Sequence, residues 1–306
     1  MSIEKDKKLL VILGPTASGK SDLAVKLAHE YNGEVVSADS RQVYKGMNIG
    51  SGKITKKEMR GVPHRLLNVA SPKQRFTVAQ FQKLAWETIK DIWKQGKMPI
   101  LCGGTGLYIQ SIVDGLVIPE VPPDAKLRTK LEKLSTEKLF KKLKKLDPCR
   151  AKNIDKQNRR RLIRALEIVI KTGEPVPVLS HETRMRETSR PGLVILQLGI
   201  AKPRKKLAKA IKKRLYKRLM QGMVAEVKRL RQQGVSWKRL EEFGLEYRAI
   251  AHYLQNKVTK QEMINKIQKE SEQYAKRQMT WFKRDKRIKW IINYKEAEKL
   301  TKEFLK

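Results

Sequence analysis

The sequence has little cysteine and no long apolar run, and each absence excludes a class of protein. Only two of its 306 residues are cysteines, Cys102 and Cys149, which is too few for the framework of a disulfide-stapled secreted domain. No Cys/His spacing matches a zinc site, and His181-Glu182 lacks the second histidine of a zinc-protease motif. No stretch approaches the roughly 18 apolar residues that span a membrane. We therefore expect a cytoplasmic protein with no membrane partner.

Acidic residues are also scarce. The chain has 31 Asp and Glu against 69 Lys and Arg, which gives a formal net charge of +38. Such an excess repels itself unless a polyanion neutralises it, and Lys/Arg-rich surfaces bind nucleic acid with release of counterions. A basic protein that binds no nucleic acid is the alternative, because binding depends on where the charges cluster.

Short apolar runs alternate with helical patterns through the first hundred residues. This alternation predicts a parallel α/β sheet flanked by helices. The apolar spacing predicts helices over residues 21–31 and 77–95. Strands are predicted at residues 9–13, 34–38, 65–69 and 99–102.

The composition changes after Gly115, where the segment PEVPP forms a stiff hinge. Residues 121–190 carry 20 Lys/Arg against 9 Asp/Glu in helical patterns, which predicts an inserted all-helical lobe. Residues 193–198 return to strand character, a mostly helical basic segment follows, and a last strand is predicted at residues 288–292. We therefore expect a core formed by residues 1–115 and 193–306, with a lobe at residues 116–192.

The most specific motif is GPTASGKS, which fits the phosphate-loop pattern G-x-x-x-x-G-K-[ST] between a predicted strand and a predicted helix. Its backbone N–H groups and the helix N-terminus form an anion site, Lys20 adds a point charge and Ser21 a hydroxyl for Mg²⁺. The same loop serves hydrolysis, phosphoryl transfer and displacement of diphosphate, so it does not name a reaction. No guanine-reading Asn-Lys-x-Asp motif is present, which disfavours a simple GTPase.

Three further features lie where they can serve this loop. Asp39 ends the second predicted strand, and its carboxylate can be a general base, an acceptor for water molecules bound to Mg²⁺, or a helix or turn cap. The glycine-rich turn at residues 103–106 follows another predicted strand. It can contact the ligand, or it can be a plain strand-to-helix connection with Thr105 as N-cap. Arginines crowd residues 159–164 and suit phosphate contacts better than a solvated face. Trp281 and Phe282 fit core positions better than base stacking.

Taken together, these motifs resemble those of the bacterial tRNA dimethylallyltransferases, also called tRNA isopentenyltransferases. The likeness runs nearly end to end. It rests on GPTASGKS at 14–21, SADSRQVYKGMNIG at 37–50, GVPH at 61–64, GGTGLYIQ at 103–110, RRRLIRALE at 159–167 and RQMTWFKR at 277–284.

The resemblance implies transfer of a dimethylallyl group from dimethylallyl diphosphate to the N6 amine of the adenosine 3′ of the tRNA anticodon, with Mg²⁺ as cofactor. Asp39 matches the general base, Thr16 orients the reacting groups, and Lys20 balances the leaving diphosphate. Arg214 matches an arginine that reaches the diphosphate. The loop residues that hold the diphosphate are Gly14, Pro15, Thr16, Ala17, Ser18, Gly19, Lys20 and Ser21.

The resemblance also implies which residues contact the RNA. The target adenine must leave its stack in the RNA to reach the diphosphate. The implied tRNA-binding residues are Asp39, Ser40, Arg41, Gln42, Thr105, Arg128, Arg160, Arg161 and Arg164, in a monomer that grips the anticodon stem-loop. Prenylation of free adenine nucleotides, small-molecule phosphoryl transfer and a non-catalytic RNA-binding protein are the alternatives.

The sequence departs from the family pattern near the expected diphosphate site. Arg65 and Asn68 stand where relatives often carry His and Asp, and Ser51-Gly52-Lys53 replaces a common Thr-Ala-Lys. The C-terminal zinc finger of eukaryotic relatives is absent, as expected for a bacterial-type enzyme. These departures concern details of the loop near the diphosphate and not the reaction.

Overall fold

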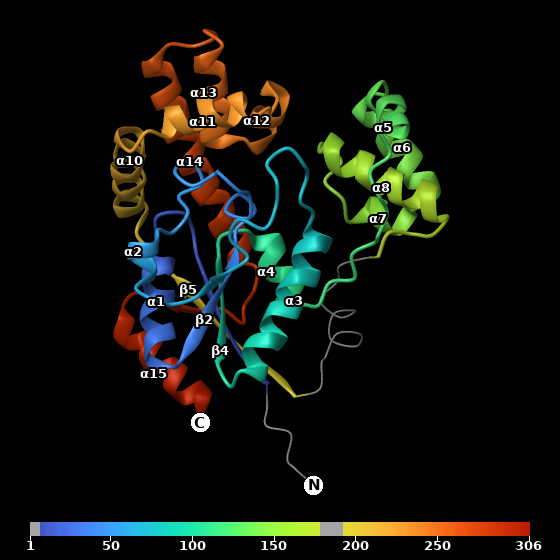
Figure 1. Cartoon of the computed structure of the whole chain (residues 1–306). Coiled ribbons are helices and arrows are strands. Elements are labelled where there is room, and N and C mark those ends of the chain that lie inside the picture. Colours follow the sequence, from blue (N-terminus) through green and yellow to red (C-terminus); the bar gives the residue numbers. More distant parts are fainter. Residues whose placement is uncertain (1–6, 178–191) are drawn as a thin grey trace. The chain divides into compact units, whose positions relative to one another are not determined.

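The computed structural model describes residues 7–177 and 192–306 (Figure 1). Contacts within the chain define two compact units. One comprises Met1–Val113 and Pro191–Lys306 and contains the sheet; the other is Asp114–Arg190 and is helical. The boundaries of the helical unit differ by two residues at each end from those expected at residues 116–192.

The first unit is built on a parallel sheet with strand order β3-β2-β4-β1-β5-β6. β1 lies at its centre and is almost wholly buried, which explains its continuous apolar sequence. The strands are β1 (Lys7–Leu13), β2 (Gly33–Ala38), β3 (His64–Arg65), β4 (Met98–Gly103), β5 (Leu193–Ile200) and β6 (Lys289–Ile291).

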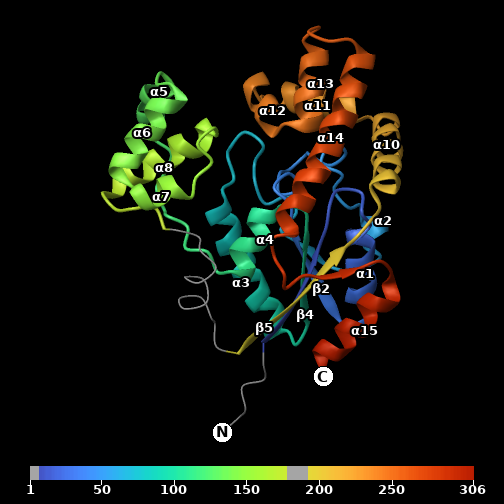
Figure 2. The same ribbon diagram turned by 180° about the vertical axis from the view of Figure 1, so that it is seen from behind.

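Helices cover both faces of this sheet (Figures 1 and 2). Successive β1 side chains point to opposite faces, so Leu9 and Val11 belong to one apolar cluster and Leu10 and Ile12 to the other. The first cluster packs against α3 (Val78–Lys94) and α4 (Gly106–Val113), and the second against α1 (Lys20–Glu30) and α15 (Tyr294–Leu305).

The remaining helices of this unit lie toward the carboxyl edge of the sheet (Figure 1). They are α2 (Lys56–Met59), α10 (Arg204–Met220), α11 (Met223–Gln232), α12 (Trp237–Phe243), α13 (Leu245–Leu254) and α14 (Lys260–Phe282). α14 begins in a capping box, in which Thr259 and Glu262 satisfy each other's backbone N–H groups. Its last turn carries Gln278 and Phe282 into the interior.

The second unit has its own small apolar core. Leu139 and Leu143 of α6 meet Leu162 and Leu166 of α8, and all four are fully buried. Asp147 caps α7 through the Arg150 N–H at 2.8 Å and binds the Val176 N–H at 2.7 Å. The helices are α5 (Ala125–Glu132), α6 (Thr136–Leu146), α7 (Pro148–Lys152) and α8 (Arg159–Thr172).

The predicted fold class is confirmed, and two element predictions need comment. The strand predicted at residues 65–69 is wrong, because Leu66 and Asn68 take left-handed φ values of 62° and 59° that end β3 after Arg65. The C-terminal helix α15 was not predicted. Phe282 is buried and Trp281 packs partly buried against the same core, as expected from their sequence context.

Candidate active site

The phosphate loop lies between β1 and α1. Gly14 and Gly19 take φ values of 155° and 103°, which residues other than glycine rarely adopt. No side chain caps the N-terminus of α1, so its first N–H groups stay available to an anion. The Ser18 hydroxyl is buried without a hydrogen-bond partner among the residues that the structure describes. The loop therefore has the form of an anion site with unsatisfied donors.

Three cations contact the loop, and a fourth lies beside one of them. Lys20 Nζ donates to the Pro15 carbonyl at 3.3 Å, and Lys202 Nζ to the Ala17 carbonyl at 3.4 Å. Arg214 Nη1 lies 3.5 Å from Thr16 Oγ1, and Arg218 lies next to it. Burial lowers the pKa of Lys20, and the charge of Arg214 lowers it further, against the opposing effects of Cys102 and Asp39. Burial and Arg218 likewise lower the pKa of Arg214. Bound diphosphate would offset this repulsion.

A second glycine turn packs against the loop through Gln278, which the sequence interpretation missed. The Thr16 N–H donates to Gln278 Oε1 at 2.9 Å, and Gln278 Nε2 donates to the Gly104 carbonyl at 2.7 Å. A Cβ on Gly104 would lie 2.4 Å from Gln278 Nε2, so a side chain at this position would displace the glutamine amide. The only sequence signal was the position of this glutamine within RQMTWFKR.

We predict that Gln278→Met impairs the loop, because it leaves the Thr16 N–H and the Gly104 carbonyl unpaired. Two lost hydrogen bonds to buried groups should lower the free energy of unfolding by about 1–3 kcal/mol. They should also raise the KM for dimethylallyl diphosphate about tenfold by loosening the loop. Gln268→Met is the matched control, because Gln268 lies on the same helix, away from the loop, and its partly buried amide donates to Glu272 at 3.1 Å. Equal KM values for the two variants would contradict a positioning role for Gln278.

Asp39 follows β2, and its Oδ1 accepts the backbone N–H groups of Arg41 at 2.8 Å and Gln42 at 3.3 Å. The turn-cap interpretation is therefore correct. It does not exclude a role as base, because Oδ2 accepts no hydrogen bond from the part of the chain that the structure describes. Asp39 also acts electrostatically on Lys20 and Arg214. One carboxylate oxygen thus holds the turn while the other stays available.

The turn of Asp39 is joined to the second glycine turn. The Ser40 N–H donates to Thr105 Oγ1 at 3.0 Å, and the Thr105 N–H donates to the Ala38 carbonyl at 3.2 Å. A Cβ on Gly103 would lie 2.1 Å from the Ala38 carbonyl oxygen, so only glycine allows this approach. The Thr105 hydroxyl therefore accepts a hydrogen bond that holds the Asp39 turn. Burial raises the pKa of the neighbouring Tyr274 to about 12.

Arg41 and Gln42 fix the outer side of this turn. Arg41 Nε donates to the Phe243 carbonyl at 2.8 Å, and Gln42 Nε2 to the Gly52 carbonyl at 3.3 Å. Their side chains thus hold the protein's own backbone, while Ser40 is partly exposed beside them.

The loop at residues 48–53 is held by a buried carboxylate that the sequence interpretation also missed. Glu226 of α11 accepts the N–H groups of Asn48, Ile49 and Gly50 at 2.7–2.9 Å, and the Tyr247 hydroxyl at 2.9 Å. Arg218 donates to the carbonyls of Ile49 and Gly50 at 2.9 and 3.0 Å. A Cβ on Gly52 would lie 2.6 Å from Arg214 and 2.7 Å from Arg218, so glycine at this departure from the family pattern leaves room for both guanidinium groups.

The second departure, Asn68, binds a buried lysine. Lys53 Nζ donates to Asn68 Oδ1 at 2.6 Å, to Asn48 Oδ1 at 3.0 Å and to the Tyr44 carbonyl at 2.8 Å. None of these acceptors carries a charge, and burial lowers the pKa of Lys53 to about 8. Three acceptors match the three N–H bonds of the ammonium, which keeps it in place despite its burial.

We predict that Asn68→Asp removes a pH dependence of stability. Between about pH 8 and pH 10.5 the unfolded chain binds more protons at Lys53 than the native chain does, so the free energy of unfolding rises with pH. The difference between the pKa values of Lys53 in the unfolded and native chains corresponds to about 3 kcal/mol at most. An aspartate at 68 would raise the pKa of Lys53 and flatten this rise. Urea unfolding from pH 7 to 10 measures the slope, with the exposed Asn256→Asp as control; an unchanged slope would contradict the assignment.

In the helical unit, two of the predicted RNA-binding arginines hold an internal carboxylate. Arg128 binds Glu167 through two bonds of 2.7 and 2.6 Å, and Arg164 binds it at 2.6 Å and the Val121 carbonyl at 2.9 Å. Glu167 is fully buried, and these partners lower its pKa against the effect of burial. Arg160 and Arg161 are exposed at the start of α8.

Among residues 7–177 and 192–306, no group of three or more His, Cys, Asp or Glu side chains could hold a metal ion. Ser21 is exposed in the first turn of α1. Its hydroxyl fits the Mg²⁺ chemistry of a phosphate loop, in which ligand phosphates and water supply most of the oxygen ligands. The fit therefore depends on a bound diphosphate.

The fold and the site define an α/β protein of the phosphate-loop class that keeps a carboxylate beside its anion site. A model of the IPP transferase family matches residues 42–285. The chain is 42% identical over 304 residues to the tRNA dimethylallyltransferase of Carboxydothermus hydrogenoformans, which covers 98% of this chain and 96% of the relative. It is 39% identical over 286 residues to that of Anoxybacillus flavithermus, with 93% and 90% covered. The chain belongs to the IPP transferase family.

Solved structures agree with this assignment. The tRNA isopentenylpyrophosphate transferase of Bacillus halodurans is 35% identical with a TM-score of 0.71, and covers 98% of this chain and 95% of its own. A eukaryotic dimethylallyltransferase acting on tRNA is 29% identical with a TM-score of 0.75, over 90% of this chain and 69% of that one. The family resemblance drawn from the sequence is thus confirmed. No described helix is both long and apolar enough to cross a membrane.

Proposed function

We propose that this chain transfers a dimethylallyl group from dimethylallyl diphosphate to the N6 amine of the adenosine 3′ of the tRNA anticodon and releases diphosphate. One observation carries the proposal: a chain of hydrogen bonds joins the phosphate loop to the Asp39 turn. It runs from Thr16 through Gln278 to Gly104, and the adjoining Thr105 binds Ser40. An anion site and a free carboxylate oxygen are therefore held in fixed relation, as an alkyl transfer with a diphosphate leaving group requires.

The residues divide the chemistry between them. The carbon–oxygen bond to the diphosphate breaks, the carbon–nitrogen bond to the adenine amine forms, and Asp39 Oδ2 accepts the amine proton. Lys20 and Arg214 stabilise the negative charge that grows on the leaving diphosphate, and the N–H groups of the loop share it. The hydroxyl of Thr16, next to Arg214, orients the diphosphate end of the donor. Mg²⁺ held through Ser21 would supply further charge neutralisation when bound.

The tRNA substrate fits two sets of residues. In the core unit, Ser40 and Thr105 border the carboxylate, and the backbone that Arg41 and Gln42 hold in place shapes the entry for a flipped adenine. In the helical unit, exposed Arg160 and Arg161 suit phosphate contacts on the anticodon stem, whereas Arg128 and Arg164 set the shape of the unit through Glu167. One chain supplies every residue of this scheme, so we propose a monomer that works in the cytoplasm, where tRNA is modified.

The test is incubation of the protein with dimethylallyl diphosphate, Mg²⁺ and unmodified tRNA, followed by mass analysis of the nucleosides. We expect adenosine heavier by one five-carbon prenyl unit at the position 3′ of the anticodon. Parallel reactions with AMP, ADP and ATP as acceptors test the rival reaction on free nucleotides. A product on the free nucleotides and none on tRNA would overturn the proposal.

The charge of the chain adds a further expectation. With a net charge of +38, binding of unmodified tRNA should weaken by at least a hundredfold between 50 and 200 mM salt, because each phosphate contact releases counterions. A non-catalytic RNA-binding protein would show the same salt dependence but no prenylated product. Fluorescence titration of labelled tRNA at both salt concentrations gives the affinities.

A further inference from the structure

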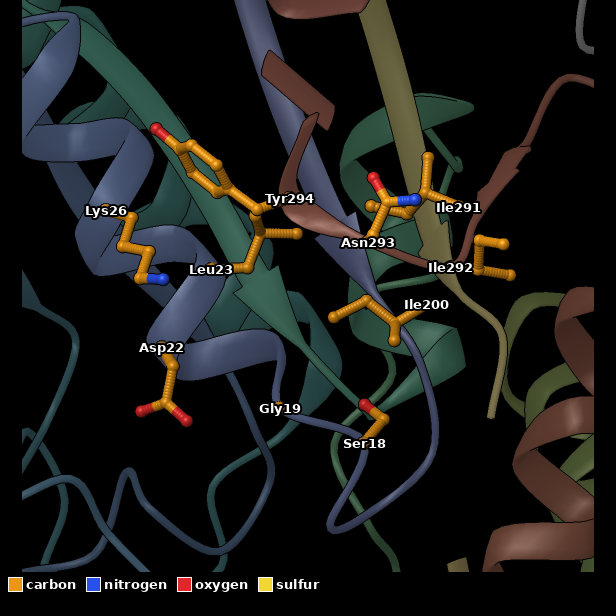
Figure 3. Close-up of a pocket in the computed structure, with 10 residues that line it drawn as sticks. All are labelled: Ser18, Gly19, Asp22, Leu23, Lys26, Ile200, Ile291, Ile292, Asn293 and Tyr294. Carbon is orange, nitrogen blue, oxygen red and sulfur yellow. The ribbon is translucent and has the colours of Figure 1, made fainter. Parts of the chain in front are cut away.

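The phosphate loop follows β1, and only one side of that strand leads to Asp39. The strand order places β2 and β4 on one side of β1, and β5 and β6 on the other. On the β5–β6 side, Ser18, Ile200 and Ile292 border a pocket of about 200 Å³ (Figure 3). Asp39 comes directly after β2 and lies on the opposite side. A base whose amine gives its proton to Asp39 is therefore bound by residues on the β2 side.

Tyr274 of α14 lies on that side, and the proposed prenyl transfer leaves it without a role. It comes one helical turn before Gln278, and residues four apart share a helix face. Gln278 fixes this face against both glycine-rich turns, through the Thr16 N–H at 2.9 Å and the Gly104 carbonyl at 2.7 Å. The Tyr274 side chain is partly buried beside Thr105. Its position is thus set by the same helix face that holds the phosphate loop.

The Tyr274 hydroxyl ends a chain of hydrogen bonds that starts at the Asp39 turn. The Ser40 N–H donates to Thr105 Oγ1 at 3.0 Å, which leaves the Thr105 O–H to donate in turn. Burial raises the pKa of Tyr274 to about 12, and the hydrogen bond with Thr105 opposes this rise, as a donor to the tyrosine oxygen does. The Tyr274 hydroxyl therefore keeps its own proton at neutral pH, and no acceptor for it lies within the part of the chain that the structure describes.

This proton lies near the carboxylate that the reaction needs. Asp39 and Arg41 both act electrostatically on the Tyr274 hydroxyl, with opposite signs. The guanidinium carbon of Arg277 lies 5.9 Å from the Tyr274 ring centroid and holds the ring from its face. A hydrogen-bond donor and a carboxylate acceptor thus lie at one end of the same site. The matching pattern on adenine is its Watson–Crick edge, where the N6 amine donates and the neighbouring N1 accepts.

We propose that Tyr274 donates a hydrogen bond to N1 of the target adenine while Asp39 accepts one from its N6 amine. The two bonds fix the plane and the rotation of the flipped base, so the amine faces the carbon of the prenyl donor. They also exclude guanine, whose N1 carries a hydrogen and whose neighbouring group is a carbonyl. The inference rests on the proposed function, because it takes Asp39 as the group that faces the amine.

The test measures kcat/KM for prenyl transfer by the full chain to anticodon stem-loop RNA with adenosine or 1-deazaadenosine at the target position. In 1-deazaadenosine a C–H group replaces N1, so the acceptor of the proposed bond is missing. The parent should lose about 10–100-fold on this analogue, as expected for a buried donor left without a partner. Tyr274→Phe should lose a similar factor on adenosine and at most about threefold more on the analogue, because the two changes remove one bond. With 7-deazaadenosine, which keeps N1, the parent should react as with adenosine.

Tyr216→Phe is the matched control, because Tyr216 lies on α10 with 44% of its surface exposed, and it should discriminate as the parent does. A parent that treats adenosine and 1-deazaadenosine alike would overturn the inference without any variant. So would a Tyr274→Phe chain that is slower on both RNAs by one factor, because a merely structural tyrosine leaves their ratio unchanged. A loss on 7-deazaadenosine instead of 1-deazaadenosine would also overturn it. A parent that prenylates none of these RNAs would contradict the proposed function itself, so the two failures are distinguishable.

Discussion

Replacing Asp39 by asparagine should lower kcat for prenyl transfer to tRNA by about 10²–10⁴-fold, the range that removal of a general base produces. Asparagine keeps an Oδ1 that accepts the N–H groups of Arg41 and Gln42, so the turn should persist. The atom that would receive the amine proton, however, becomes an NH₂ group that cannot accept it. The KM for dimethylallyl diphosphate should change little, because the phosphate loop is untouched.

Single-turnover transfer under saturating tRNA and donor measures this effect directly. Asp91→Asn is the matched control, since Asp91 is an exposed carboxylate on α3 that binds the side chain of Gln95. If Asp39→Asn transferred the prenyl group within a few-fold of the parent rate, a different base would have to be sought. Asp39 would then be a turn cap alone.

Replacing Lys20 by methionine should have two effects of opposite sign. Without ligand, the variant should be more stable than the parent, because the burial and the neighbouring Arg214 that lower the pKa of Lys20 also make its charge costly there. With ligand, it should lose about 10²–10³-fold in kcat/KM for dimethylallyl diphosphate, as when one preorganised charge on a leaving group is removed.

Thermal unfolding with and without inorganic diphosphate separates the two effects. The parent should gain several degrees in Tm from diphosphate, whereas Lys20→Met should start higher and gain little. Lys94→Met controls for the loss of one positive charge, because Lys94 is exposed at the end of α3. A ligand-free Tm below that of the parent would contradict the account of Lys20 as a strained cation that awaits an anion.

The sequence was sufficient wherever local chemistry decides the structure. A buried parallel strand reads as a continuous apolar run, and a phosphate loop requires glycines at fixed spacing, so β1 and the loop could be predicted with their neighbours. The family resemblance then supplied the reaction and the role of Asp39. The end of β3 was missed, because left-handed φ values at Leu66 and Asn68 leave no clear pattern in the sequence.

Only the tertiary structure showed what holds the site together. Gln278 lies 262 residues from Thr16, and Glu226 lies more than 170 residues from the loop it binds, so no local pattern relates them. The family resemblance assigned Arg128 and Arg164 to RNA contacts, and folding turns both toward the buried Glu167. Sequence by itself determined which chemical groups this protein carries. Their partners were decided by packing, because a buried polar group takes the partner that folding brings within hydrogen-bond distance, however far along the chain that partner lies.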